Sequence, residues 1–321
     1  MASNLHALAP GTRVLVTGAS GFIGAHLLGR LVESGCRVVA LARPISDLWR
    51  IEPLLDRAEL VRSELDGVEP ADVGPVDVVF HLAAAGVQAS QADPAGIVEV
   101  NVNGTLRMLR LADVLGAKRF VYCGSCFEYG GGSGLREDRL PAPLSEYGAS
   151  KAAGWMLAHA YSRRHDLPVA SVRPFTVYGP LEGGLRLVPH VVRTALAGEP
   201  IELTGGEQRR DFVYVDDAVD GLMRAAAAPG AAGGTFNLAT GSPVSVKEVV
   251  ATVLEVTGSA SEPLFGARPY RDSEVPTLSG DTSAAREELG WTARTSLRAG
   301  IEATVEWQRG RRLRELAVSR A

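Results

Sequence analysis

Tyr147 and Lys151 are the residues whose types and spacing most directly predict chemistry in this sequence. They lie four positions apart, and on a helix that spacing sets the phenol and the ammonium side by side on one face. A phenol is a poor base at neutral pH because its reference pKa is about 10, but an adjacent cation favours the phenolate. Such a pair exchanges a proton with a hydroxyl or carbonyl while a hydride moves to or from a cofactor. The same spacing also fits an ordinary amphipathic helix with a solvated lysine, so the interpretation depends on the surrounding motifs.

Three glycines near the start of the chain predict the binding site of that cofactor. Gly18, Gly21 and Gly24 follow a short apolar run at residues 13–17 and open a helical pattern that continues to residue 34. Glycines at this spacing permit a tight turn and let a pyrophosphate approach the unpaired amides of a helix N-terminus. We therefore expect a dinucleotide at this turn. The residues expected to bind it there are Gly18, Ser20, Gly21, Phe22, Ile23 and Gly24.

The end of the second predicted strand, residues 37–41, bears on which nicotinamide cofactor binds. A carboxylate at this place binds the ribose 2′-hydroxyl, whereas an arginine accommodates a 2′-phosphate. The strand continues into Ala42-Arg43-Pro44, without an acid. Arg43 therefore favours NADP(H) as the cofactor, and NAD(H) is the alternative if Arg43 is simply a solvated loop residue.

The elements that must position these residues alternate between strand and helix. This alternation predicts an α/β fold of the Rossmann type, a doubly wound parallel sheet. Leu82, Ala83 and Ala84 at the end of one strand are expected to lie against the dinucleotide, and Ser125 follows another strand at the edge where ligands sit. The predicted strands are at residues 13–17, 37–41, 59–65, 76–82, 120–123 and 169–173, and the predicted helices are at 22–34, 93–115 and 147–165.

The alternation loosens after the first half of the chain. We expect residues 1–176 to form the dinucleotide-binding domain and residues 177–321 to form mainly a smaller C-terminal α/β lobe that binds the substrate. Segments near 211–242 are expected to return to the first domain. A glycine- and proline-rich stretch, residues 130–145, is predicted to be a loop. Further helices are predicted at 187–197, 216–228, 245–257, 283–289 and 297–317.

Composition and charge exclude several classes of function. A net charge of −4 and a pI near 5.9 give no reason to expect nucleic acid or an anionic membrane as a partner. No segment approaches the roughly 18 uninterrupted apolar residues of a membrane helix. Residues 1–10 lack the basic and apolar regions of a signal peptide, and the three cysteines lack zinc-site spacing. We expect a cytoplasmic protein with free thiols and no metal.

Motifs along nearly the whole chain resemble the extended short-chain dehydrogenase/reductase family, in its NAD(P)-dependent nucleotide-sugar epimerase/dehydratase branch. The resemblance implies an enzyme acting on a nucleotide-diphosphate sugar and a homodimer formed through the Asn101 and Tyr147 helices. The motifs that carry it are Thr17-Gly-Ala-Ser-Gly-Phe-Ile-Gly24, His81-Leu-Ala-Ala84, Asn101-Val-Asn-Gly-Thr105, Tyr147-Gly-Ala-Ser-Lys151, Arg173-Pro-Phe-Thr-Val-Tyr-Gly-Pro180 and Arg210-Asp-Phe-Val-Tyr-Val-Asp-Asp217.

The resemblance also implies roles by position. Tyr147 matches the acid/base, and Lys151 matches the residue that lowers the pKa of this tyrosine and holds the nicotinamide ribose. Ser125 matches the hydroxyl that hydrogen-bonds the reacting sugar oxygen. The resemblance places Asn101 at the cofactor as well. Arg210 and Arg268 match the ligands of the substrate diphosphate, a task that suits a planar guanidinium.

Departures from the family pattern narrow the chemistry. The 4,6-dehydratases carry an Asp-Glu pair directly after the catalytic hydroxyl, and UDP-glucuronate decarboxylases carry a glutamate at the second of those positions. Here the two substrate-facing positions hold Cys126 and Phe127. Cys126 is expected to be a buried, inert thiol, and Glu128 is one place late and is expected to point elsewhere. Thr176 replaces the asparagine common in the family and alters a substrate contact.

Two reactions need only Ser125, Tyr147, Lys151 and a hydride carrier. Reduction of a nucleotide-linked 4-keto-(6-deoxy)hexose with NADPH is our first prediction, because Arg43 favours that cofactor. The alternative is 4-epimerisation of a nucleotide sugar with tightly bound NAD. Dehydration or decarboxylation, and a non-catalytic NADP-sensing protein, are less favoured by these residues.

Overall fold

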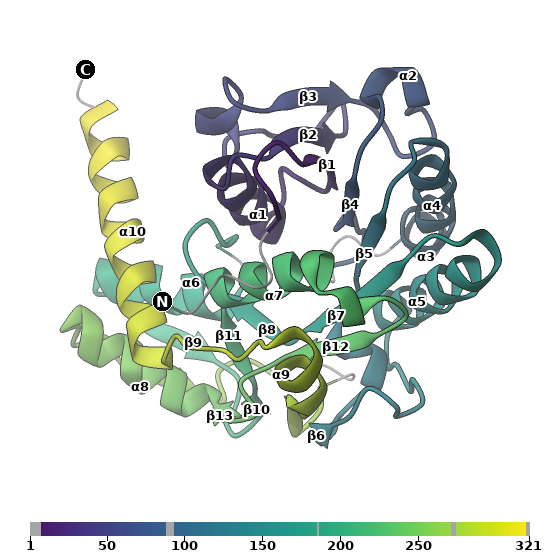
Figure 1. Ribbon diagram of the computed structural model, residues 1–321. Coiled ribbons are helices and arrows are strands. Elements are labelled where there is room, and N and C mark those ends of the chain that lie inside the picture. Colours follow the sequence, from purple (N-terminus) through teal and green to yellow (C-terminus); the bar gives the residue numbers. More distant parts are fainter. Residues whose placement is uncertain (1–7, 88–92, 185, 271–273, 319–321) are drawn as a thin grey trace.

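A parallel sheet lies at the centre of the molecule (Figure 1). The computed structural model describes residues 8–87, 93–184, 186–270 and 274–318, with side chains as far as residue 311. Among these residues, seven strands pair in the order β12-β7-β5-β4-β1-β2-β3, and each neighbouring pair is parallel. The predicted doubly wound sheet is therefore confirmed. Its strands are β1 (Arg13–Thr17), β2 (Arg37–Ala42), β3 (Glu59–Arg62), β4 (Val78–His81), β5 (Arg119–Cys123), β7 (Val169–Pro174) and β12 (Thr235–Leu238).

The order of the strands reverses beside β1, because β2 lies on one side of it and β4 on the other. Open α/β sheets bind ligands outside the carboxyl ends of the strands at such a point. Thr17 at the end of β1 is paired in register with His81 at the end of β4. The glycine turn that follows Thr17 and the segment that follows His81 therefore face the same space.

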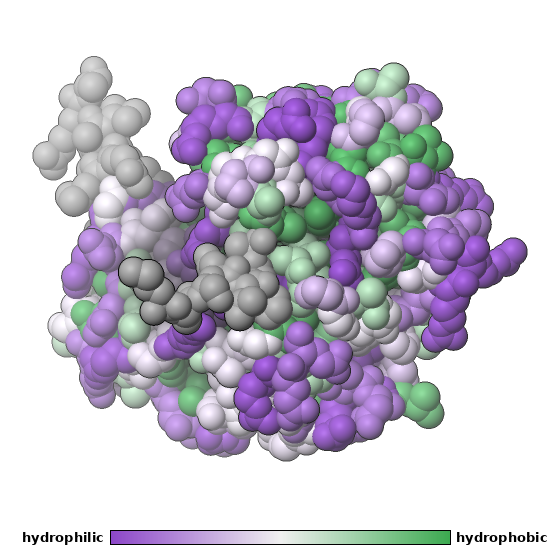
Figure 2. Space-filling model, in the orientation of Figure 1, coloured by the Kyte–Doolittle hydropathy of each residue, from purple (hydrophilic) through white to green (hydrophobic). Residues whose placement is uncertain are grey.

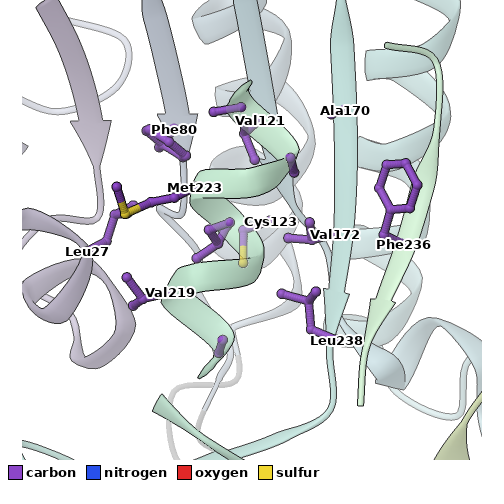
Figure 3. Packing of buried hydrophobic residues seen from close by; sticks show 14 of the residues in the cluster. Leu27, Phe80, Val121, Cys123, Ala170, Val172, Val219, Met223, Phe236 and Leu238 are labelled. Carbon is purple, nitrogen blue, oxygen red and sulfur yellow. The ribbon is translucent and has the colours of Figure 1, made fainter. Parts of the chain in front are cut away.

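Helices cover both faces of the sheet. Because side chains alternate along a strand, Val16 packs on the face that carries α1 and α7, and Leu15 packs on the face that carries α4 and α5. Figure 3 shows α7 lying across the strands, with Val219 on it and Met223 beside Leu27. These helices are α1 (Phe22–Glu33), α4 (Gly104–Val114), α5 (Glu146–His165) and α7 (Val215–Ala227).

A segment from the second half of the chain completes this layer. Strand β12 pairs with β7, with Thr235 opposite Ser171, and α7 packs against α1. Residues 215–238 thus lie on the sheet built by the first half of the chain, in the region where the sequence predicts a return. The domain boundary at residue 176 itself stays a prediction.

The remaining elements form a second group below the sheet in Figure 1. Its apolar core joins α6, α8, α10 and strand β9. In the described part of the chain, β13, β10, β15 and β6 make one small sheet, and β11–β8 and β14–β9 make two parallel pairs. The helices of this core are α6 (Leu187–Ala197), α8 (Val246–Thr257) and α10 (Leu297–Val318). Helix α9 (Ser283–Leu289) packs instead on the core of the central sheet, against β12 and α7. The strands are β6 (Gly132–Leu135), β8 (Thr176–Tyr178), β9 (Ile201–Leu203), β10 (Arg209–Arg210), β11 (Phe212–Tyr214), β13 (Val244–Ser245), β14 (Pro263–Phe265) and β15 (Thr277–Gly280).

Two predicted segments differ from the structure. The stretch 130–145, predicted as a loop, contains β6, because β15 from far along the chain pairs with it. The predicted helix 93–115 is divided into α3 (Pro94–Val98), a π-helical turn at Glu99–Asn103 and α4. The wider π-helical turn holds the Asn101 side chain in the interior.

The surface is mixed in hydropathy, as the composition of the chain predicts (Figure 2). Figure 2 shows hydrophilic and hydrophobic residues interspersed over this face of the molecule. Within the described residues, no helix combines the length and apolarity needed to cross a membrane.

Candidate active site

A cavity of about 1570 Å³ opens at the carboxyl ends of the central strands. This volume is well above the roughly 300–1,000 Å³ of a site for one drug-sized ligand, so the cavity has room for two ligands. Residues from both halves of the chain line it. The predicted site residues found on its wall are Gly18, Ser20, Gly21, Phe22, Ile23, Gly24, Arg43, Leu82, Ala83, Ala84, Ser125, Cys126, Phe127, Tyr147, Lys151, Thr176, Arg210 and Arg268.

The turn between β1 and α1 has the shape that a dinucleotide requires. Gly18 has a φ of +70°, and a Cβ there would lie 2.7 Å from the backbone nitrogen of Ala83. A Cβ on Gly24 would lie 2.1 Å from the carbonyl oxygen of Gly18. Side chains at these positions would force the turn apart. Helix α1 begins after Gly21, whose lack of a side chain leaves the first amides uncapped toward the cavity.

His81 supports the wall of the cavity. Thr105 Oγ1 donates to the carbonyl of Asn101 at 2.7 Å, so it accepts from His81 Nε2 at 3.1 Å. His81 Nδ1 is then the acceptor for the Thr17 hydroxyl at 2.8 Å. Burial, and secondarily the charge of Lys151, lowers the pKa of His81 to about 3. This histidine is neutral and structural.

Asn101 differs from its predicted role as a cofactor ligand. Its side chain is 1% exposed and is absent from the cavity wall of the described chain. Its amide instead donates to the carbonyl of Ala85 at 3.0 Å and to Ser150 Oγ at 2.9 Å, and accepts from the Ala85 amide at 2.8 Å. The π-helical turn aims Asn101 inward, where it joins the Ala85 segment to the helix that carries Tyr147.

The predicted catalytic residues converge on the cavity. Helix α5 begins at Glu146, with Ser145 as its N-cap, and this places Tyr147 in the first turn and Lys151 one turn later. Lys151 is only 2% exposed, and its ammonium lies 4.5 Å from the centre of the Tyr122 ring. Ser125, 6% exposed, follows β5 and faces the same space. Proton transfer to a ligand oxygen is the chemistry that this arrangement permits.

Burial and several neighbouring groups influence the pKa of the Tyr147 phenol. Burial is the largest influence, and it raises the pKa of the phenol. The groups that act to lower this pKa are the Ser125 hydroxyl, through a hydrogen bond, and the charge of Arg186. Lys151, whose own pKa is lowered by burial, has its ammonium over the Tyr122 ring. The role of Lys151 in lowering the pKa of Tyr147 stays a prediction.

The residues after Ser125 are a buried thiol and a phenyl ring. Burial raises the pKa of the Cys126 thiol to about 12, so it is protonated and inert at neutral pH. Phe127 is 43% exposed, and its ring lies edge-on to Tyr147 with centroids 6.2 Å apart. Glu128 is fully buried and turned away from the cavity. Thr176 lies on β8 at the cavity wall.

The predicted phosphate ligands lie farther along the cavity and are each paired with a carboxylate. Arg210 bonds Glu274, and its Nη1 donates to the backbone of Arg209 at 2.8 Å. Arg268 is exposed and lies 3.4 Å from Glu202. A phosphate would have to compete with these carboxylates. Arg43 is exposed at the opposite edge of the cavity, directly after β2.

Sequence reasoning missed several polar residues of the cavity, among them three that lie close together in the chain. Glu182, Arg186 and His190 all line it, shortly after the motif that ends at Pro180. Burial raises the pKa of Glu182 to about 8, and its Oε2 has no hydrogen-bond partner among the described residues. The only available signal was their proximity in sequence to a motif already singled out.

Comparisons with known proteins agree with this geometry. A model of the NAD dependent epimerase/dehydratase family matches residues 14–239. The chain belongs to this family. A UDP-glucose 4-epimerase of Mycolicibacterium smegmatis is 35% identical over 317 residues, which span 93% of this chain and 99% of the relative. The membership confirms the resemblance to extended short-chain dehydrogenases/reductases, and the chain is an enzyme of that class.

Solved structures of similar proteins carry ligands. MoeE5, solved in complex with UDP-glucuronic acid and NAD and also with UDP-glucose and NAD, is 38% identical with a TM-score of 0.84, covering 93% of this chain and 99% of its own. A UDP-glucose 4-epimerase of Thermotoga maritima, solved with UDP-glucose, is 28% identical with a TM-score of 0.87, covering 94% of this chain and 99% of its own.

The residues of this epimerase/dehydratase family member fit a nicotinamide dinucleotide. The Gly18–Gly24 turn would hold the pyrophosphate, because any Cβ at its two ends collides with backbone. Lys151 presents a buried ammonium to the cavity, where it would meet ribose hydroxyls. Arg43 stands where the adenosine ribose is expected.

Proposed function

We propose that the protein is a UDP-sugar 4-epimerase that keeps NAD bound throughout turnover. The observation that carries this proposal is the convergence of Ser125, Tyr147 and Lys151 on one cavity, with an inert thiol and a phenyl ring where dehydratases and decarboxylases need acids. Relatives that match the chain over nearly its whole length are named as UDP-glucose and UDP-glucuronate 4-epimerases. These relatives favour the epimerase alternative over the 4-ketoreduction that Arg43 alone suggested.

Each residue has one task in this reaction. A dinucleotide held by the Gly18–Gly24 turn and Lys151 would supply the hydride chemistry at the sugar C4, oxidation followed by reduction from the other face. Tyr147 removes the proton of the C4 hydroxyl and later returns it to the same oxygen. Ser125 hydrogen-bonds that oxygen and, through its bond to Tyr147, favours the phenolate. Arg210 and Arg268 hold the diphosphate while the sugar turns over between the two steps.

Arg43 supports a second candidate. It lines the cavity directly after β2, where a 2′-phosphate would be accommodated, and so it favours NADPH and a 4-ketoreductase. The relatives solved with NAD speak against this choice. The two candidates predict different cofactor behaviour, since an epimerase regenerates its cofactor in each cycle and a reductase consumes it.

One experiment separates the candidates. Freshly purified protein is denatured, the released dinucleotide is identified, and intact protein is incubated with UDP-glucose and with UDP-glucuronic acid without added cofactor. We expect stoichiometric NAD and formation of the C4 epimer of at least one sugar, followed by proton NMR. An empty site with reversible NADPH binding, and oxidation of NADPH by a UDP-4-keto sugar, would establish the reductase instead.

We also infer a homodimer formed through the α3–α4 region and α5, as the family resemblance implies. Exposed apolar side chains on these elements support it: Val98 is 48% exposed and Met156 is 52% exposed. Multi-angle light scattering of the purified protein tests this inference, and a monomer mass at micromolar concentration contradicts it.

A further inference from the structure

A buried ion pair lies directly behind the catalytic serine. Glu128 and Arg173 are both 0% exposed, and Arg173 Nε donates to Glu128 Oε2 at 2.7 Å. The guanidinium also lies 4.7 Å from the ring centres of Tyr129 and Trp155. A charge pair removed from water in this way is costly to form, and removing one partner leaves an uncompensated buried charge.

The second oxygen of Glu128 reaches the catalytic segment. Glu128 Oε1 accepts a hydrogen bond from the backbone amide of Ser125 at 2.8 Å. Ser125 Oγ in turn accepts from the amide of Phe127 at 3.2 Å, so the serine and the glutamate cap the same short turn from both sides. The carboxylate therefore links the Ser125 backbone to the guanidinium of Arg173, with one oxygen for each.

The other side of Arg173 is fixed to the body of the protein. Its Nη1 donates to Tyr129 Oη at 2.8 Å, and that hydroxyl donates to Asn237 Oδ1 at 2.8 Å. Asn237 belongs to β12 and bonds the carbonyl of Leu135 at 2.7 Å. The position of the Ser125 backbone is thus set by a chain of hydrogen bonds that ends on a strand of the central sheet.

The packing around Gly124 and Glu128 leaves little space for the Ser125 backbone to move. A Cβ added to the neighbouring Gly124 would lie 2.4 Å from Glu128 Oε1 and 3.0 Å from the carbonyl of Val172. The carboxylate fills the space under the turn, and the serine hydroxyl faces the cavity above it.

We propose that Glu128 and Arg173 are positioning residues for catalysis, which act through Ser125 and touch neither substrate nor cofactor. This inference rests on the proposed 4-epimerase function. Glu128 places the Ser125 hydroxyl where it bonds both Tyr147 and the reacting sugar oxygen. Substitution of Glu128 should therefore reproduce, in weaker form, the loss of the serine hydroxyl.

A double-mutant cycle tests this directly. Glu128→Gln keeps an acceptor for the Ser125 amide but turns a donor toward Arg173, and Ser125→Ala removes the hydroxyl on which Glu128 acts. We expect Glu128→Gln to lower kcat roughly 10- to 100-fold with KM changed less than about threefold, because misplaced catalytic groups cost rate more than binding. In the Ser125→Ala background, Glu128→Gln should lower kcat no further. Equal fold-losses in both backgrounds would overturn the proposal.

The pH profile gives a second readout, which a general loss of stability would not move. The Ser125 hydrogen bond lowers the pKa of Tyr147. Loss or distortion of this hydrogen bond should raise the pKa of Tyr147 and so shift the acidic limb of the kcat/KM profile to higher pH. The shift should have the same direction in Glu128→Gln and in Ser125→Ala. An unshifted limb in Glu128→Gln contradicts the proposal.

Two further variants keep the test informative. Asp217→Asn is the matched control: Asp217 is another buried carboxylate, it accepts from the Thr295 amide at 2.9 Å, and it lies on α7 outside the described cavity wall. It should leave the pH limb and kcat near wild type. If Glu128→Gln fails to fold, Glu128→Asp replaces it, because the shorter side chain cannot reach both partners. A wild-type protein without epimerase activity would refute the proposed function, whereas the comparison between variants alone decides the role of Glu128.

Discussion

The phenol of Tyr147 is subject to opposing influences. Burial raises its pKa, and Ser125 and Arg186 act to lower it. A buried phenol that must lose and regain a proton depends on such neighbours, because without them the neutral form is too strongly favoured. In the proposed reaction the hydroxyl is the group on which turnover depends, and the ring contributes packing against Phe127.

Tyr147→Phe separates these two contributions. The variant keeps the ring and removes the proton carrier, so we expect the epimerisation rate to fall by at least about 100-fold while the content of bound dinucleotide stays at the wild-type level. Turnover is measured by NMR and dinucleotide content by denaturation of the purified variant. Retention of more than a few per cent of the rate would show that another group carries the proton.

Glu182 is a carboxylic acid whose pKa is raised by its surroundings. Burial raises its pKa from an ordinary value near 4.5 to about 8, and the charge of Arg186 offsets only part of this effect. The folded protein therefore retains a proton that the unfolded chain loses. Stability is highest below the unfolded pKa, and it falls as the pH rises toward about 8.

Glu182→Gln should remove this slope. Between pH 4.5 and about 8 the wild-type free energy of unfolding should decline by up to roughly 1.4 kcal/mol per pH unit on account of this group, and the variant should lack that contribution. Urea denaturation at a series of pH values measures it. Glu199→Gln, at an exposed glutamate, is the control and should follow the wild-type curve. Identical slopes in wild type and Glu182→Gln would show that Glu182 ionises normally.

At the scale of single residues, the sequence allowed prediction of the groups that carry local motifs. Tyr147 and Lys151 share one helix, and Gly18 belongs to a short turn, so each group can be found from local spacing read together with the neighbouring motifs. Glu128 and Arg173 are 45 positions apart, and only the pairing of β5 with β7 brings them together. No local pattern predicts such a pair: the sequence predicts only that Glu128 points elsewhere, and it gives Glu128 no role of its own.

The glycines of helix α1 differ in whether their surroundings leave room for a side chain. Two of them, Gly24 and Gly29, lie on the same helix in different surroundings. A Cβ on Gly24 would lie 2.1 Å from the Gly18 carbonyl, whereas a Cβ on Gly29 would meet only Leu54 Cδ1, at an ordinary 3.7 Å. The first glycine sets the approach of the helix to the cofactor turn, and the second only weakens the helix.

Alanine at these two positions should have opposite effects. Gly24→Ala pushes α1 away from the turn, so we expect it to lose its bound dinucleotide and to unfold at lower temperature. Gly29→Ala should keep the dinucleotide and gain up to roughly 1 kcal/mol, the helix propensity of alanine over glycine. Dinucleotide content and calorimetry measure both effects. Normal dinucleotide content in Gly24→Ala would contradict the packing argument.

Elements were predictable where their own sequence favours them. The apolar runs of β1, β2, β4, β5 and β7 are strong local signals, and helices α1, α4 and α7 have clear hydrophobic periodicity, whereas α5 does not. Strand β6, with the sequence Gly-Ser-Gly-Leu, has little strand propensity, and it forms because β15 pairs with it. The π-helical turn before α4 likewise follows from the inward position of Asn101, which a helical pattern does not encode.

At the scale of the whole molecule, the two halves of the chain are joined at the edge of the cavity. Arg50 Nε, from the loop after β2, donates to the Leu181 carbonyl at 2.9 Å, and His26 Nε2 bonds the Pro180 carbonyl at 2.8 Å. Helix α10, which rises from the second group of elements in Figure 1, brings Arg311 to within 5.1 Å of the centre of the Trp49 ring.

Trp49 lies at the centre of this junction. The Arg50 guanidinium stacks on it at 4.4 Å, so one indole ring meets a cation from its own loop and another from α10. Arg50 and the neighbouring Ser46 also line the cavity. We expect release of a bound dinucleotide to require movement of this loop away from α10, and the contact of Trp49 with Arg311 opposes that movement.

Trp49→Ala should accelerate the release of the dinucleotide. A cation–π contact contributes about 0.5–1 kcal/mol at exposed sites, which corresponds to an increase of roughly 2- to 5-fold in the dissociation rate when the Arg311 contact is lost. Dissociation is followed by dilution of the loaded protein into excess labelled dinucleotide. Arg309→Ala, on the same helix but bonded to the Thr257 carbonyl and not to Trp49, is the matched control and should release the dinucleotide at the wild-type rate. Equal rates in all three proteins would mean that the loop opens without parting from α10, and the cavity would then have to open elsewhere along its rim.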